Sequence, residues 1–110
     1  MTKQPSLSTR TQTTLHVFGS MIRAARLERK MPQQELAERM GVSRQTVSAI
    51  EKGDAKVAIG TAFEAAAIVG IPLLAESTRD LQRLSMTVAS LASLLPERAR
   101  APQVELDDDF

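Results

Sequence analysis

The alternation of apolar and polar residues predicts two short helices joined by a tight turn between residues 33 and 53. Gly41 stands where a helix can end in a left-handed residue, and Ser43 is a favourable N-cap for a second helix. Ala37 supplies the small side chain that two steeply crossing helices need at short distance. This is the sequence form of a helix-turn-helix, whose inward positions are Leu36, Ala37, Met40, Val47 and Ile50.

Helices are also expected on both sides of this pair. A first helix should run from about residue 15 to about residue 30, and a fourth should begin between residues 57 and 61 and end near residue 69. Met31 should plug the core, and Pro32 should stand at the edge of the second helix, where its missing N–H is harmless. The expected core residues are Leu15, Phe18, Ile22, Ala25 and Leu27 in the first helix, and Ile59, Phe63, Ala66, Ala67 and Val69 in the fourth.

The apolar pattern of residues 77–96 predicts one more helix. Its apolar side chains repeat at intervals of three and four residues, which is the a/d pattern of a coiled coil. Because four helices already account for a compact core, we expect this stripe to pair with a second copy of the chain. The expected dimer interface consists of Leu81, Leu84, Val88, Leu91 and Leu95.

Composition argues against several classes of protein. The 110 residues contain no cysteine, which excludes disulfides and thiol catalysis, and the one histidine, His16, has no partner at useful spacing. The acidic run 107–109 is not expected to hold a metal, and no cofactor is expected. We therefore expect no enzyme. No secretory signal or membrane-spanning stretch is evident, so a cytoplasmic protein without membrane association is expected.

Charge is divided unevenly along the chain, although the net charge is only +1. Residues 1–56 hold ten Lys and Arg against five Asp and Glu, whereas residues 57–110 hold four against eight. A basic half beside an acidic half suggests a surface for a polyanion that is separate from a second interaction surface.

The segment Met21–Leu74 resembles the lambda-repressor and Cro-like helix-turn-helix family, often called XRE. The family commonly has Ser or Thr where this chain has Pro32. The resemblance implies an all-α fold: a compact four- to five-helix lambda-repressor-like DNA-binding domain, here with an additional C-terminal dimerisation helix and flexible tails. The residues that match the family pattern are Gln33, Glu35, Leu36, Ala37, Gly41, Val42, Ser43, Val47, Ile50, Glu51 and Gly53.

These observations divide the chain into four predicted segments. Residues 1–14 should form a flexible arm, residues 15–76 the helix-turn-helix domain, residues 77–96 the dimerisation helix and residues 97–110 a flexible acidic tail. Val104, Leu106 and Phe110 alternate with polar residues in the tail. They could lodge in a groove on a partner, and a tail that only aids solubility is an equal alternative.

The resemblance implies that the second helix of the motif enters the major groove of double-stranded DNA. Arg44 is expected to read guanine, Gln45 to read adenine and Ala49 to touch a thymine methyl group. Glu51 is expected to be structural and to pair with Arg26 or Arg29. The full set of expected base contacts is Arg44, Gln45, Thr46 and Ala49, and that of backbone contacts is Gln33, Ser43, Lys52, Lys56 and Arg23.

A single domain of this kind makes few base contacts, so a homodimer on a pseudo-palindromic operator is expected. The leading hypothesis is a transcriptional repressor, found at the nucleoid when bound to its operator. The chain is also similar to HipB-type antitoxins, which implies autoregulation and a HipA-like kinase toxin as partner. An adaptor that uses its helix-turn-helix domain to dock other proteins is the alternative from a different class.

Overall fold

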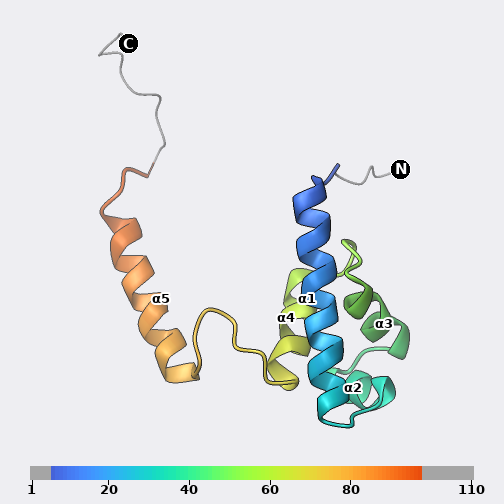
Figure 1. Ribbon diagram of the computed structural model, residues 1–110. Coiled ribbons are helices and arrows are strands. Elements are labelled where there is room, and N and C mark those ends of the chain that lie inside the picture. The colour runs from blue at the N-terminus through green and yellow to red at the C-terminus, as the bar shows by residue number, and fades with distance from the viewer. Residues whose placement is uncertain (1–5, 98–110) are drawn as a thin grey trace. The chain divides into compact units, whose positions relative to one another are not determined.

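The computed structural model describes residues 6–97, and every regular element in that range is an α-helix (Figure 1). The helices are α1 (Thr9–Glu28), α2 (Gln33–Met40), α3 (Arg44–Lys52), α4 (Ile59–Ile68) and α5 (Thr78–Ser93). Helices α1 to α4 form one compact unit that ends at Leu73, and α5 belongs to a second unit. The all-α prediction is therefore confirmed.

Helix α1 begins six residues earlier than the apolar pattern indicated, so the predicted arm over residues 1–14 is wrong for residues 9–14. The Ser8 hydroxyl accepts the N–H of Thr11 at 3.1 Å, and the Thr14 hydroxyl donates to the carbonyl of Arg10 at 2.8 Å. A polar helical extension has no apolar periodicity to reveal it. The helix also ends earlier than predicted, because Lys30 adopts a left-handed φ of 53°.

The helix pair α2–α3 has the predicted bounds and the predicted turn. Gly41 adopts a φ of 74°, and the Ser43 hydroxyl accepts the N–H of Thr46 at 3.2 Å, as an N-cap does. Pro32 occupies the N-cap position of α2 and offers no side-chain bond there. The turn thus rests on two local signals that a sequence displays directly.

The core of the first unit is aliphatic. Ile22, Leu36, Val47 and Val69 are its largest fully buried side chains, and each contributes about 1.5–3 kcal/mol through burial. Met31 is only 6% exposed, which confirms its predicted place in the core. The remaining buried apolar residues are Ala37, Ile50, Ala65 and Ala66.

Backbone contact between α1 and α3 depends on two glycines. A Cβ atom at Gly19 would lie 2.5 Å from the carbonyl oxygen of Ile50, and one at Gly53 would lie 2.7 Å from the backbone of Leu15. Real Cβ atoms do not approach other atoms so closely. Gly19, which the sequence pattern did not single out, therefore sets how near α3 can lie to α1.

Several residues that were predicted to face the core lie at the surface instead. Leu27 is 48% exposed because the inward position at this level of α1 is taken by the buried Arg26. Ile59 is 71% exposed and Phe63 44% exposed, because α4 turns the smaller Ala65 and Ala66 inward. Ala67 is also exposed.

Helix α5 is well capped but contributes nothing to a core. The Ser77 hydroxyl accepts the N–H of Asp80 at 3.0 Å, and no residue of the helix is buried. Leu84 is partly buried, whereas Leu81, Val88 and Leu91 are 42%, 53% and 60% exposed. Leu95 follows the end of the helix, so the predicted stripe is helical only as far as Leu91. Within the described ranges, no helix is both long enough and apolar enough to cross a bilayer.

Candidate nucleic-acid interface

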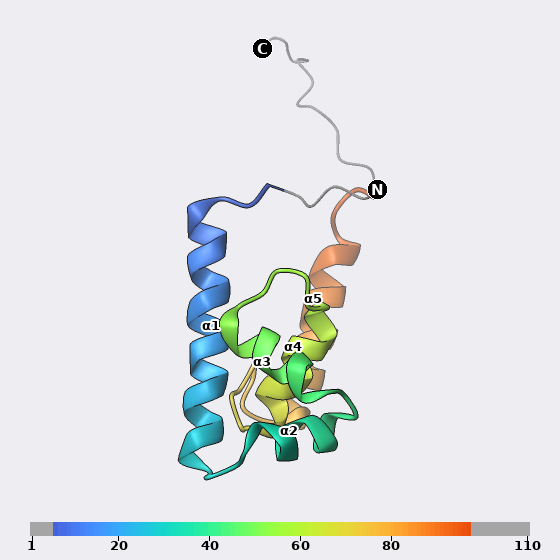
Figure 2. The same cartoon turned by 90° about the vertical axis from the view of Figure 1, so that its right-hand side faces the viewer.

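The outer face of α3 carries three of the four side chains that the sequence assigned to base contacts, Arg44, Gln45 and Ala49. Val47, Ile50 and Glu51 are buried, so the helix presents its opposite side to solvent, facing the viewer in Figure 2. A shallow hollow of about 280 Å³ lies on this side. Its lining consists of Arg44, Gln45, Ser48, Ala49, Lys52 and Asp54.

Ser48 is a member of this face that the sequence analysis missed. It stands four residues after Arg44, one helical turn further along the same side, so helical spacing could have identified it. Thr46 does not line the hollow; it is partly buried, and its hydroxyl lies 3.1 Å from that of Ser43. Ser43 and Thr46 thus cap α3 together, and their contacts with DNA remain predictions.

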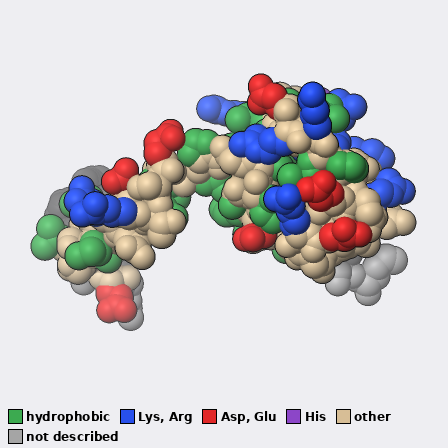
Figure 3. Space-filling model, turned by 90° about the horizontal axis from the view of Figure 1, so that it is seen from below, with side chains coloured by type: hydrophobic (Ala, Val, Ile, Leu, Met, Phe, Trp, Pro, Cys, Tyr) green, Lys and Arg blue, Asp and Glu red, His purple; other side chains and the backbone are tan. Residues whose placement is uncertain are grey.

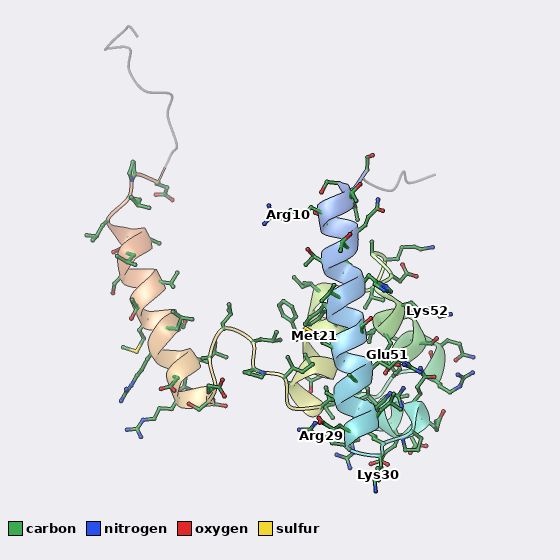
Figure 4. The ribbon with its side chains drawn as sticks, viewed as in Figure 1. Arg10, Met21, Arg29, Lys30, Glu51 and Lys52 are labelled. Carbon is green, nitrogen blue, oxygen red and sulfur yellow. The ribbon has the colours of Figure 1, made fainter. Side chains whose placement is uncertain are left out.

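An ion pair buried beneath α3 joins it to α1. Arg26 donates from Nε to Glu51 Oε2 at 2.6 Å and from Nη2 to Oε1 at 3.0 Å, and the two side chains are 7% and 3% exposed. A third donation reaches the carbonyl of Met31 at 2.7 Å. Figure 4 shows Glu51 between the two helices. The predicted structural role of Glu51 is confirmed with Arg26 as its partner, while Arg29 donates to the carbonyl of Ala25.

Gln33 connects this buried pair to the surface. Its amide nitrogen donates to Glu51 Oε1 at 3.1 Å, and its amide oxygen accepts from Arg44 Nη1 at 3.3 Å. The carboxylate of Glu51 can only accept, so the NH₂ group must face inward and the oxygen outward. Gln33 was predicted only as a phosphate contact. Its link to Glu51, eighteen residues away, has no signature in local spacing.

The predicted phosphate-contacting residues lie at different places on the domain. Lys52 extends outward from α3 (Figure 4), and Lys56 is exposed in the following loop, where its N–H donates to Asp54 Oδ1 at 2.9 Å. Arg23 is exposed on α1 and does not line the hollow. Seen from below, Lys and Arg side chains are interspersed with Asp and Glu side chains over the visible face of the domain (Figure 3).

Two groups of predicted site residues are not among the residues that line the outer face of α3. Val104, Leu106 and Phe110 lie outside the described residues. The predicted dimer residues Leu81, Leu84, Val88 and Leu91 belong to α5. Within residues 6–97, no group of His, Asp and Glu side chains is arranged to hold a metal ion.

A comparison with protein families matches residues 22–75 to the family described as Helix-turn-helix. The matched segment includes the second part of α1 and all of α2, α3 and α4. This domain belongs to the lambda-repressor-like helix-turn-helix family. The family consists of DNA-binding transcription regulators, so the helix-turn-helix domain is a DNA-binding regulatory domain. Searches of curated proteins and of solved structures found no match to the chain.

Proposed function

We propose that this protein is a sequence-specific transcriptional repressor that binds a pseudo-palindromic operator as a dimer. The observation that supports the proposal most directly is the position of Arg44 on the exposed face of α3. One of its terminal nitrogens donates to Gln33. A guanidinium carries five N–H donors, so the others are available to the O6 and N7 atoms of a guanine.

The neighbouring side chains complete a surface with two kinds of contact. Gln45 and Ala49 lie on the same face and would touch base edges, with Ser48 beside them. Thr46 is the fourth proposed base contact. Lys52 and Lys56 would contact phosphates, which position the domain but carry no sequence information. The remaining proposed phosphate contacts are Gln33, Ser43 and Arg23.

Dimerisation is assigned to α5. Its exposed leucines and valine form one apolar stripe, and pairing with the same stripe of a second copy would remove this stripe from water. Two-fold symmetry would then place two α3 helices in successive major grooves, about 34 Å apart. A pair of half-sites also supplies the specificity that one domain lacks.

The proposal is tested by a gel shift with the DNA upstream of the protein's own gene. The parent protein should prefer that DNA over a scrambled duplex by at least about a thousandfold. Arg44→Ala should remove about 1–3 kcal/mol of that preference, because one bidentate base contact is lost. Lys56→Ala should weaken binding to both duplexes alike and lower the salt dependence.

A matched control is Arg83→Ala, which removes an exposed arginine of α5 that is not part of its apolar stripe. This variant should bind the operator as the parent does. If Arg44→Ala also bound the operator as tightly as the parent, the proposed placement of α3 on the bases would be wrong. If the parent itself did not shift this DNA, an adaptor function would be favoured.

The antitoxin form of the proposal adds one partner, a HipA-like kinase toxin, and is supported by the similarity to HipB-type antitoxins alone. Co-purification of the protein with the product of a neighbouring gene tests this addition. A stable complex that still retards operator DNA would support an autoregulating antitoxin. Purification of the repressor without such a partner would leave a free-standing repressor.

A further inference from the structure

A second hollow lies beside the C-terminal end of α3, and Asp54 is the one residue that it shares with the hollow on the face assigned to DNA. It is enclosed by the N-terminal half of α1, the loop that joins α3 to α4, and α4 itself; Figure 2 shows this loop rising beside α1. Its volume is about 420 Å³, which is within the range of sites for small ligands. The apolar part of its lining consists of Leu15, Phe18, Ile50, Val57, Ala62 and Phe63.

The apolar walls are suited to a ring system. The Phe18 and Phe63 rings meet edge to face, with centroids 6.3 Å apart and an interplanar angle of 82°. Ile59, at the mouth, is 71% exposed and Phe63 is 44% exposed. A molecule seated between these walls would remove both side chains from water, which is favourable in proportion to the apolar area covered.

The lining of the hollow includes one acidic residue. This residue is Asp54, and its Oδ1 atom accepts the backbone N–H of Lys56 at 2.9 Å. Lys52 lines the hollow on the outer face of α3 together with Asp54 but does not line this one, and neither does Lys56. In the part of the chain that the structure describes, no ion pair engages Asp54. A positive charge at the mouth would therefore meet an acidic partner.

We propose that this hollow binds a small apolar molecule that carries one positive charge, of the class of aromatic amines. The ring system would lie against Phe18, Val57 and Phe63, and the ammonium group would lie beside Asp54. Phenylalanine rings also attract a nearby cation through their faces. The site is separate from the DNA-contacting side chains and its occupancy does not depend on the proposed function.

The experiment uses 2-naphthylmethylamine and its uncharged analogue 2-naphthalenemethanol as probes. Each is titrated into the full chain without DNA, and the methyl resonances of Val57, Ile59 and Ala62 are followed by NMR. The amine should bind saturably and shift these resonances. The alcohol should bind about threefold to fivefold more weakly, because it lacks the partly exposed ion pair with Asp54.

Three variants locate the binding and its charge preference. Asp54→Asn should make the two probes bind equally, since it keeps an acceptor for the Lys56 N–H and removes the charge. Ala62→Phe should abolish binding by filling the hollow. Ile59→Arg changes an exposed residue, so the fold should be retained, and its positive charge should weaken the amine more than the alcohol. Arg83→Ala on α5 lies outside the apolar stripe and should change neither affinity.

The proposal is overturned if the amine causes no saturable shifts, or if the shifts are confined to α5. Equal binding of both probes to the parent would remove the charge preference. A change of oligomeric state in Ala62→Phe would instead identify the hollow as an interface between copies. Because no DNA is present, a failure of the repressor hypothesis would leave all of these outcomes unchanged.

Discussion

The unit that ends at Leu73 and the unit that carries α5 use their apolar residues in opposite ways. In the first, Ile22, Leu36, Val47 and Val69 lose all contact with water. In the second, a capped helix of sixteen residues has no buried residue. A helix of this length is only marginally stable in water by itself, even with a good N-cap.

The difference separates internal stability from dependence on a partner. The first unit has a core, a buried ion pair and close backbone packing, all of which lie within its own residues. Helix α5 has an apolar stripe whose burial requires something outside the helix. Substitutions in the first unit should therefore change the free energy of unfolding, while those in the stripe should change association.

The largest expected effect comes from removing the buried carboxylate. Glu51→Ala leaves the Arg26 guanidinium buried without a counter-charge, which should cost about 3–5 kcal/mol of unfolding free energy. Urea denaturation followed by circular dichroism measures this loss. Glu35→Ala is the matched control, because Glu35 pairs with Arg39 at 2.7 Å at the surface. Its expected cost is below about 1 kcal/mol, and equal costs would contradict the structural role given to the buried pair.

Substitutions in the α5 stripe should act on association. Replacing Leu84 and Leu91 together by serine removes apolar area from the proposed interface and should weaken dimerisation by about 3 kcal/mol, a factor of more than a hundred. Sedimentation at micromolar concentration would then detect monomers with an unchanged fold in the first unit. If the parent chain is itself a monomer at that concentration, the assignment of dimerisation to α5 is wrong.

The close approach of α1 and α3 predicts a smaller loss. Gly19→Ala places a methyl group against the carbonyl oxygen of Ile50, which should cost about 1–3 kcal/mol as α3 is pushed outward. Gly60→Ala is the control, because no atom lies within 4 Å of the added Cβ in α4. That variant should be as stable as the parent or more stable by up to about 1 kcal/mol. Thermal unfolding of both variants decides whether the backbone contact is as tight as described.

The smallest effect is expected at Gln33. Gln33→Ala removes the acceptor that holds Arg44 and should weaken operator binding by about 0.5–1.5 kcal/mol. A double-mutant cycle with Arg44→Ala, measured by fluorescence anisotropy, separates this positioning effect from a direct phosphate contact. If the two substitutions were additive, Gln33 would act on DNA independently of Arg44.

Local signals in the sequence account for the parts of the fold that were predicted well. The bounds of α2 and α3 follow from Gly41, Ser43 and the spacing of Val47 and Ile50, all of which act within a few residues. The family pattern added the assignment of α3 as the helix that meets DNA. The matched segment and the helix bounds confirm the motif, whereas the individual DNA contacts remain predictions.

Features that depend on distant parts of the chain could not be derived in this way. Position 19 requires glycine because the carbonyl oxygen of Ile50 lies too close for a Cβ atom. The side chain of Gln33 is held by its hydrogen bond to Glu51. Periodicity also could not distinguish Ile59 and Phe63, which border a hollow, from residues that fill a core. The polar turns of α1 before Leu15 escaped notice because their helical structure rests on capping and side-chain hydrogen bonds.

Glu51 Oε1 accepts hydrogen bonds from two residues, and this limits how a regulator of this design can acquire new operators. Gln33 and Arg26 both donate to Glu51 Oε1, so a change at Gln33 alters a contact on which the fold itself depends. Gln45, by contrast, is exposed on the outer face of α3. A lineage could exchange the residue at position 45 with little loss of stability, so divergence of base preference should begin there and reach position 33 last.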